Sequence, residues 1–137
     1  MLLTHADANH HADIATINQL FVYPIKSCAG VSVSCMEFDQ RGPLLDRRWM
    51  LVDAETHVFL TQREFARMCL ISTAIIDGEV WASQSCEQQL PARVKLPFID
   101  STQGQVNVQV WEDSVQGFDC GDELAGWFSE LLSHPCR

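Results

Sequence analysis

The sequence lacks any long hydrophobic run. None of its apolar stretches approaches the roughly 20 residues that a membrane-spanning helix needs, so we expect no contact with a membrane. The first residues, MLLTHADANHHAD, contain no basic region and too short an apolar stretch for a signal peptide. These two absences together predict a cytoplasmic protein.

Basic residues are also scarce. The chain carries 9 lysines and arginines against 18 acidic residues, a formal net charge of −9. Binding to nucleic-acid phosphates requires the opposite sign, so we expect no nucleic-acid partner. However, six of the nine basic residues lie between Lys26 and Arg67. This half of the chain is therefore where we expect a small anion to bind.

Paired cysteine spacings are missing. The six cysteines include no Cys-x-x-Cys pair, so neither a zinc site nor a metal ligand set is expected. We expect reduced thiols, with Cys35 and Cys69 buried because each lies in an apolar run. Cys28 follows Lys26 closely, but no base with a third orienting group accompanies it. With no HExxH, GxSxG, paired-carboxylate or Rossmann signature either, we predict no catalytic residue.

The residue patterns that are present predict one domain of short strands. Residues 1–15 are polar and aperiodic and predict a disordered tail, whereas residues 16–137 fit a single domain. The segment 47–53 is expected to form a strand that pairs with 57–61. Asp77-Gly78 predicts a tight hairpin, because type I′ turns need positive φ. Alternation at Val106, Val108 and Val110 predicts a half-buried strand.

Two segments break the strand pattern. Apolar residues at 124, 127, 128, 131 and 132 have helical spacing, with Asp119 as the expected N-cap and Pro135 as the stop. Thr61–Met68 predicts a short internal helix with Thr61 as N-cap and Glu64 at the capping-box position. The predicted fold class is mainly β: a small barrel-like curled sheet with a C-terminal α-helix and one short internal helix.

The stretch VYPIKSCAG contains the densest chemistry of the chain. Pro24 belongs at a strand edge, and Gly30 is expected to provide the conformational freedom of the following turn. Lys26 and Ser27 offer a cation and a hydroxyl, and the turn amides offer further donors for an anion. A solvated Lys-Ser turn without a ligand is the alternative interpretation.

A second stretch, LLDRRWM, places two arginines side by side. In a strand, Arg47 and Arg48 would point to opposite faces, so one could face a cleft while the other faces water. Asp46 could orient its neighbour through a charge-assisted hydrogen bond. An ordinary exposed ion pair would use the same residues and remains the alternative.

Four motifs together resemble a known family. They occur in one order between Ile17 and Arg137: VYPIKSCAGVSV, LLDRRWMLVD, FLTQRE and VWEDSVQGFDCGDELAGWFSELL. These stretches resemble the N-terminal β-barrel domain that precedes the MOSC (molybdenum cofactor sulfurase C-terminal) domain. Similar domains occur in bacterial MOSC iron–sulfur proteins, the mitochondrial amidoxime-reducing component and eukaryotic molybdenum cofactor sulfurases.

The resemblance implies a cofactor role for three residues. Lys26, Ser27 and Arg47 occupy the positions that, in the family, bind the anionic end of the molybdenum cofactor, a pyranopterin phosphate. The family's molybdenum-ligating cysteine lies in the MOSC domain, and no cysteine of this chain matches it. We therefore expect a cofactor-binding accessory domain that has no activity as an isolated chain, in which the cofactor itself can be absent. The alternative is a fragment or subunit of an oxidoreductase or sulfurase, completed by a MOSC domain in cis or in trans.

Overall fold

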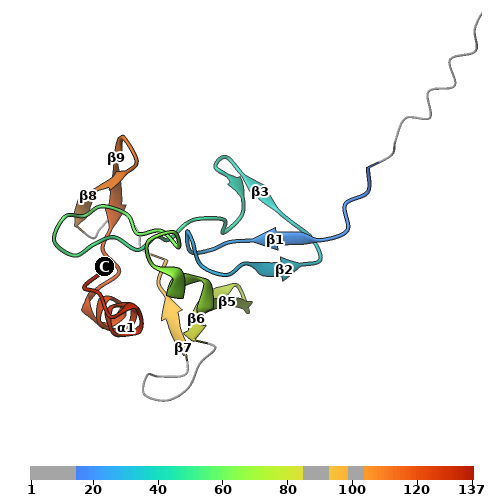
Figure 1. Ribbon diagram of the computed structural model, residues 1–137. Helices are drawn as coiled ribbons and strands as arrows, with labels where there is room; N and C mark the ends of the chain where they lie inside the picture. Colours follow the sequence, from blue (N-terminus) through green and yellow to red (C-terminus); the bar gives the residue numbers. More distant parts are fainter. Residues whose placement is uncertain (1–14, 85–92, 99–103) are drawn as a thin grey trace, which may run out of the picture.

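The computed structural model describes residues 15–84, 93–98 and 104–137 (Figure 1). The expected disordered tail at 1–15 lies outside the described residues, apart from Ala15. The described part is mainly β with one α-helix near the C-terminus, which confirms the predicted class. In chain order the elements are β1 (Leu20–Val22), β2 (Val31–Val33), β3 (Phe38–Asp39), β4 (Gly42–Pro43), the 3₁₀-helix η1 (Ala66–Leu70), β5 (Ile71–Ile76), β6 (Glu79–Gln84), β7 (Arg93–Leu96), β8 (Gln105–Val110), β9 (Asp113–Phe118) and α1 (Asp122–Leu132).

The strands do not close into a barrel within the described residues, so only the mainly β part of the predicted architecture is confirmed. They form separate antiparallel sheets in the orders β1-β2, β3-β4, β5-β6-β7 and β8-β9. Isolated bridges such as Ile25 to Trp49 and Val58 to Gln109 join the segments between them. Positive φ angles at Arg47 (49°) and His57 (57°) interrupt these segments, so a continuous ladder does not form.

The predicted Asp77-Gly78 hairpin and the predicted half-buried strand are both present. Strands β5 and β6 pair from Ile71 opposite Gln84 to Ile76 opposite Glu79. The turn residues Asp77 (φ 53°) and Gly78 (φ 78°) both have the positive φ that a type I′ turn requires. In β8, Val108 is buried and packs with Val52 and Phe59, while its neighbours Val106 and Val110 pack against the same cluster.

Helix α1 covers the larger core, as its periodicity predicts. Leu124, Trp127, Phe128 and Leu131 are all buried, and the helix contacts β7 and η1. Asp119 is not the N-cap. Gly121 (φ 96°) occupies that position, and its amide donates to Asp119 Oδ1 at 2.8 Å. The helix ends at Leu132, before Pro135, and no helix in the described residues is long and apolar enough to cross a membrane.

The internal helix begins later than predicted. The 3₁₀-helix η1 starts at Ala66, and Phe65 precedes it without a side-chain cap. The Thr61 carbonyl instead accepts the amides of Glu64 (3.1 Å) and Phe65 (2.8 Å), and the Thr61 hydroxyl lies 3.4 Å from Glu64 Oε2. Thr61 and Glu64 therefore close a turn before the helix.

The burial predicted for two cysteines is wrong. Cys35 is exposed because it lies in a bend after β2, and Cys69 is exposed because η1 turns its neighbour Met68 toward the core instead. Cys28 and Cys136 are buried. All five cysteines in the described part of the chain are free, in line with the prediction, and Cys86 lies outside that part.

Candidate anion-binding site

The two basic motifs lie side by side along their backbones. The Arg47 amide donates to the Tyr23 carbonyl (2.7 Å), and the Trp49 amide donates to the Pro24 carbonyl (3.2 Å). The Lys26 amide in turn donates to the Trp49 carbonyl (2.9 Å), which completes a parallel pairing of the two segments. Two stretches about twenty residues apart in sequence thus meet at the positions that the motifs single out.

The turn after Lys26 is built differently from the prediction. Ser27, not Gly30, has the positive φ (68°). Gly30 is needed for a different reason: a Cβ at this position would lie 2.8 Å from Tyr23 Cε1, so the Tyr23 ring rests directly on the glycine backbone. Tyr23 thereby ties the turn to the segment that precedes it.

Few backbone amides of this turn are available to a ligand. The amides of Lys26, Cys28 and Ala29 donate to the carbonyls of Trp49, Ile25 and Ile71. Ser27 differs, because neither its amide nor its hydroxyl has a hydrogen-bond partner among the described residues. The donors that remain for an anion at this turn are therefore those of Ser27 and the Gly30 amide, together with the lysine ammonium.

The two cationic side chains contact different groups. Lys26 Nζ lies 4.4 Å from the centroid of the Phe59 ring. Arg47 is exposed, with Nη1 2.5 Å from Asp46 Oδ2 and Cζ 5.6 Å from the centroid of the Tyr23 ring. Asp46 also accepts the Tyr23 amide through Oδ1 (2.8 Å), so it orients Arg47 as expected and links the two motifs. The structure pairs the backbone segments that contain Lys26 and Arg47, whereas the two side chains rest on separate rings.

Cys28 has the properties of a core residue. Its side chain is buried, and this burial, with a smaller contribution from nearby Cys69, raises the pKa of its thiol to about 12. A thiol with so high a pKa carries almost no thiolate at neutral pH, which disfavours a nucleophilic role. No cluster of three His, Cys, Asp or Glu side chains that could hold a metal ion occurs in the described residues.

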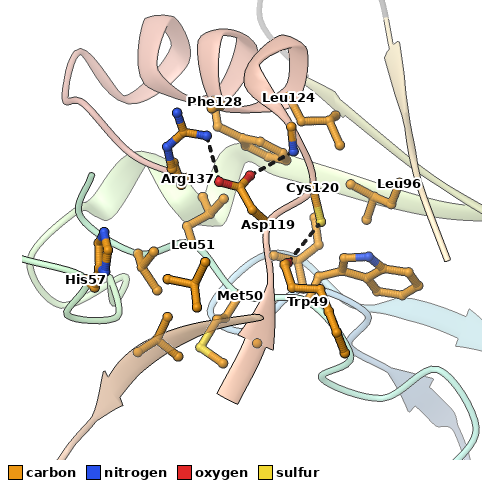
Figure 2. A pocket seen from close by; sticks show the side chains of 18 of the residues that line it. Trp49, Met50, Leu51, His57, Leu96, Asp119, Cys120, Leu124, Phe128 and Arg137 are labelled. Atoms are coloured by element: carbon orange, nitrogen blue, oxygen red, sulfur yellow. Dashed lines mark hydrogen bonds and ion pairs between the residues drawn. The ribbon is translucent and has the colours of Figure 1, made fainter. Parts of the chain in front are cut away.

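A separate cavity of about 230 Å³ lies between α1, β9 and the segment 48–52 (Figure 2). Most of its wall is apolar, including Leu51, Leu124 and Phe128. Its arginines are already paired, Arg48 with Asp39 (2.5 Å) and Arg137 with Asp119 (2.7 Å). None of the three predicted site residues lines it. A phosphate would lose hydration against this apolar wall, so the cavity is a poor anion site.

The cavity was not foreseen from the sequence. Its wall combines segments from several separate parts of the chain, and of the two adjacent arginines Arg48, not Arg47, contributes to it. The expectation that one of the two adjacent arginines faces a cleft and the other faces water therefore fits Arg48 and Arg47, respectively.

Comparison with known proteins identifies the family. The family described as the MOSC N-terminal beta barrel domain matches residues 14–135. The chain belongs to this family. Among similar proteins, molybdenum cofactor sulfurase of Danio rerio is 31% identical over 137 residues, covering 96% of this chain and 16% of the sulfurase. Mitochondrial amidoxime-reducing component 1 of Mus musculus is 34% identical over 129 residues, covering 90% of this chain and 37% of that protein.

The chain therefore spans only a minor part of the length of these relatives. A solved solution structure of a Bordetella bronchiseptica protein matches with a TM-score of 0.64 and 20% identity, covering 85% of this chain and 84% of that one. At this identity the match supports the fold alone.

Proposed function

We propose that this MOSC N-terminal domain is an accessory, cofactor-binding domain of a molybdenum-cofactor protein. In this proposal Lys26, Ser27 and Arg47 form an anion site for the phosphate end of the pyranopterin. The observation that supports it is the parallel backbone pairing of the segments that carry Lys26 and Arg47, next to the turn in which Ser27 has unpartnered donors. The names of the relatives, a molybdenum cofactor sulfurase and an amidoxime-reducing component, support the choice of cofactor.

The donor set suits a phosphate. Arg47 offers a planar fork for two oxygens, Lys26 a compact charge, and Ser27 a hydroxyl and an amide. Each charge-assisted hydrogen bond contributes about 1.5–3 kcal/mol before the cost of ordering the side chains. The net charge of −9 opposes an anion only weakly at this point, because physiological salt screens charges beyond about 8 Å.

The same donor set does not suit a metal ion. Lysine, arginine and serine are donors that favour the oxygens of an anion, while the nearest thiol, Cys28, is buried and protonated. Bound cofactor would supply the redox chemistry of molybdenum, and the residues of this chain would hold and orient its phosphate end. The ligand of the metal would come from another domain.

The second candidate is a fragment or subunit of an oxidoreductase or sulfurase that a separate MOSC domain completes. The small share of each relative that the chain spans, 16% and 37%, favours it. The two candidates differ in one result: a MOSC domain added in trans should create activity only if the second is right. In both, the chain alone should neither reduce N-hydroxylated substrates nor transfer sulfur. The cytoplasmic location stays a prediction, and one relative is named mitochondrial.

An NMR titration tests the anion site. Inorganic phosphate and pyrophosphate are added to ¹⁵N-labelled chain at constant ionic strength, and the backbone amides are followed. We expect the shifts to concentrate at residues 26–30 and around Arg47. The affinity should be weak, because part of the contacts would come from another domain, and Arg47→Ala should abolish the shifts.

Arg63→Ala is the matched control. It removes the same charge from the same basic half of the chain, and Arg63 has no ion pair within the described residues. Binding should survive this substitution. Shifts that scatter over the surface, or an equal loss of binding in both variants, would show that phosphate senses only the overall charge and would refute the site.

A further inference from the structure

Two aromatic residues from motifs without an assigned role contact the proposed anion site. We propose that Phe59 and Trp111 form an aromatic corner that positions the Lys26 ammonium for an anion. Phe59 belongs to the FLTQRE motif, and Trp111 belongs to the closing VWEDSV stretch. This inference rests on the proposed function, and it adds two positioning residues that act through Lys26.

The contact geometry defines the corner. Lys26 Nζ lies 4.4 Å from the centroid of Phe59 and 5.7 Å from that of Trp111, both within the range of a cation–π interaction. The two rings meet edge to face, with centroids 4.8 Å apart and planes at 68°. Phe59 is buried, while Trp111 is 62% exposed, so the corner has one wall in the core and one wall at the surface.

Backbone pairing holds the two rings in place. The Phe59 amide donates to the Gln109 carbonyl (3.0 Å), and the Gln109 amide donates to the His57 carbonyl (2.9 Å), which fastens the 57–59 segment to β8. The Gln109 side chain then donates to the Trp111 carbonyl at 2.6 Å. Trp111 itself has a φ of 55° in the β8–β9 turn, a conformation that is rarely adopted without local constraint. The fold thus builds the corner from fixed parts.

The excess of carboxylates in this chain gives a reason for an aromatic corner around Lys26. Of its two lysines, Lys95 forms an ion pair with Glu79, whereas Lys26 has no carboxylate partner among the described residues. A carboxylate would restrain the Lys26 side chain but would also neutralise its charge. Aromatic faces attract the ammonium and leave its charge uncompensated. The flexible stem is then restrained before an anion arrives, which reduces the ordering cost of binding.

The free protein gives the first test. Selective labelling with ¹³Cε,¹⁵Nζ-lysine yields only two lysine signals, and Lys95→Arg assigns them. We expect the Lys26 Hε protons to show an upfield ring-current shift in the unchanged chain. Trp111→Leu should reduce that shift, while Lys95 should not move. This readout requires no ligand. The ring-current shift depends on where the Trp111 ring lies relative to Lys26, so a Trp111 that only supported folding, away from Lys26, would not produce it.

Phosphate affinity gives the second test. Trp111→Leu should weaken binding of inorganic phosphate about two- to fivefold, the fold-change expected for an exposed cation–π contact. Trp111→Tyr should restore most of the affinity. Phe38→Leu is the matched control, because Phe38 is a similarly exposed aromatic (70%) outside the corner, and it should leave the affinity unchanged.

The outcomes separate the two proposals. If the unchanged chain binds no phosphate, the proposed function fails, and the corner fails with it as a device for anion binding. If phosphate binds but Trp111→Leu binds it as tightly or more tightly, the corner alone is refuted. An unshifted Lys26 signal in the free protein would likewise refute the corner, whatever the affinity of the site.

Discussion

A methyl group on Gly30 would collide with the ring of Tyr23, at 2.8 Å from Cε1. We predict that Gly30→Ala displaces this ring and, with it, the Arg47 guanidinium, whose Cζ lies 5.6 Å from the centroid of the same ring. Overpacking against a core costs about 1–3 kcal/mol, but the Tyr23 ring is 39% exposed and can move, so the free energy of unfolding in urea should fall by only about 1 kcal/mol. Gly126→Ala is the control: a Cβ there meets nothing within 4 Å, and alanine in this helix should raise stability by about 0.5–1 kcal/mol. Equal stability of both variants would contradict the account.

Cysteine reactivity should separate Cys28 from the exposed thiols. Burial raises the pKa of Cys28 to about 12, whereas Cys35 and Cys69 are exposed. Because the thiolate is the reactive form, iodoacetamide at pH 8 should label Cys35 and Cys69 quickly and Cys28 only after unfolding. Peptide mapping by mass spectrometry gives the rate at each site. Labelling of native Cys28 as fast as Cys35 would show an accessible thiol and reopen a nucleophilic role.

For single residues, the sequence shows which side chains could bind an anion, but it does not show which other side chains they contact. Lys26 and Ser27 can be singled out from their motif because charge and hydrogen-bonding capacity are intrinsic to a side chain, whereas the choice of Arg47 over Arg48 comes from the family resemblance. The contact of Gly30 with Tyr23 and that of Lys26 with Phe59 cannot be, because each depends on which ring lies across the turn. The prediction that Cys35 is buried was wrong for the same reason. Apolar neighbours in the sequence do not set the direction of a side chain in a bend.

Between elements, the hydrogen bonds of the Asp53 carboxylate, first with Thr56 and then with His134 of the C-terminal segment, predict an effect of pH on stability. Hydrogen bonds from Thr56 to the Asp53 carboxylate, and then the contact with His134 Nε2 (2.8 Å), hold the pKa of Asp53 well below its usual range. The carboxylate form therefore stabilises the fold. This stabilisation is complete above the unfolded pKa of about 3.9 and is lost as pH falls through the lower folded value.

Asp53→Asn checks this sign. The variant should be less stable than the unchanged chain at pH 7, and the difference in unfolding free energy should shrink as the pH falls below about 4. Urea denaturation at pH 7 and pH 3 gives the two differences. A gap that stays constant, or grows toward acid, would show that the charge of Asp53 contributes nothing and that only its shape matters.

Elements with a strong period are those that the sequence predicts well. Helix α1 and strand β8 follow from apolar spacings of 3.6 and 2 residues, since each buries one face. The segment 47–53 was expected to be a strand that pairs with 57–61. Residues 51–53 do pair antiparallel with 58–60, but Arg47 lies in a turn and Trp49 pairs instead with Ile25. That partner is distant in sequence, so no local period reports it.

For the whole molecule, the acidic net charge argues against a nucleic-acid-binding protein and the cysteine spacing argues against a zinc protein. The arrangement of the sheets, in contrast, depends on tertiary contacts. The strands are short and their turns are marked, so a mainly β class can be predicted. Whether the strands close into one sheet depends on ladders between segments such as 23–26 and 47–49, and here these ladders are brief. The cavity beside α1 depends on the same packing and has no sequence signature.

The central claim is that Lys26 and Arg47, whose side chains rest on separate rings in the free chain, bind one anion together. The most direct measurement is a single pyrophosphate titration that follows the side-chain NMR signals of Lys26 Nζ and Arg47 Nε in the same sample. One shared site predicts that both signals shift and give the same dissociation constant. Two different constants, or a shift at only one of the two side chains, would contradict the account.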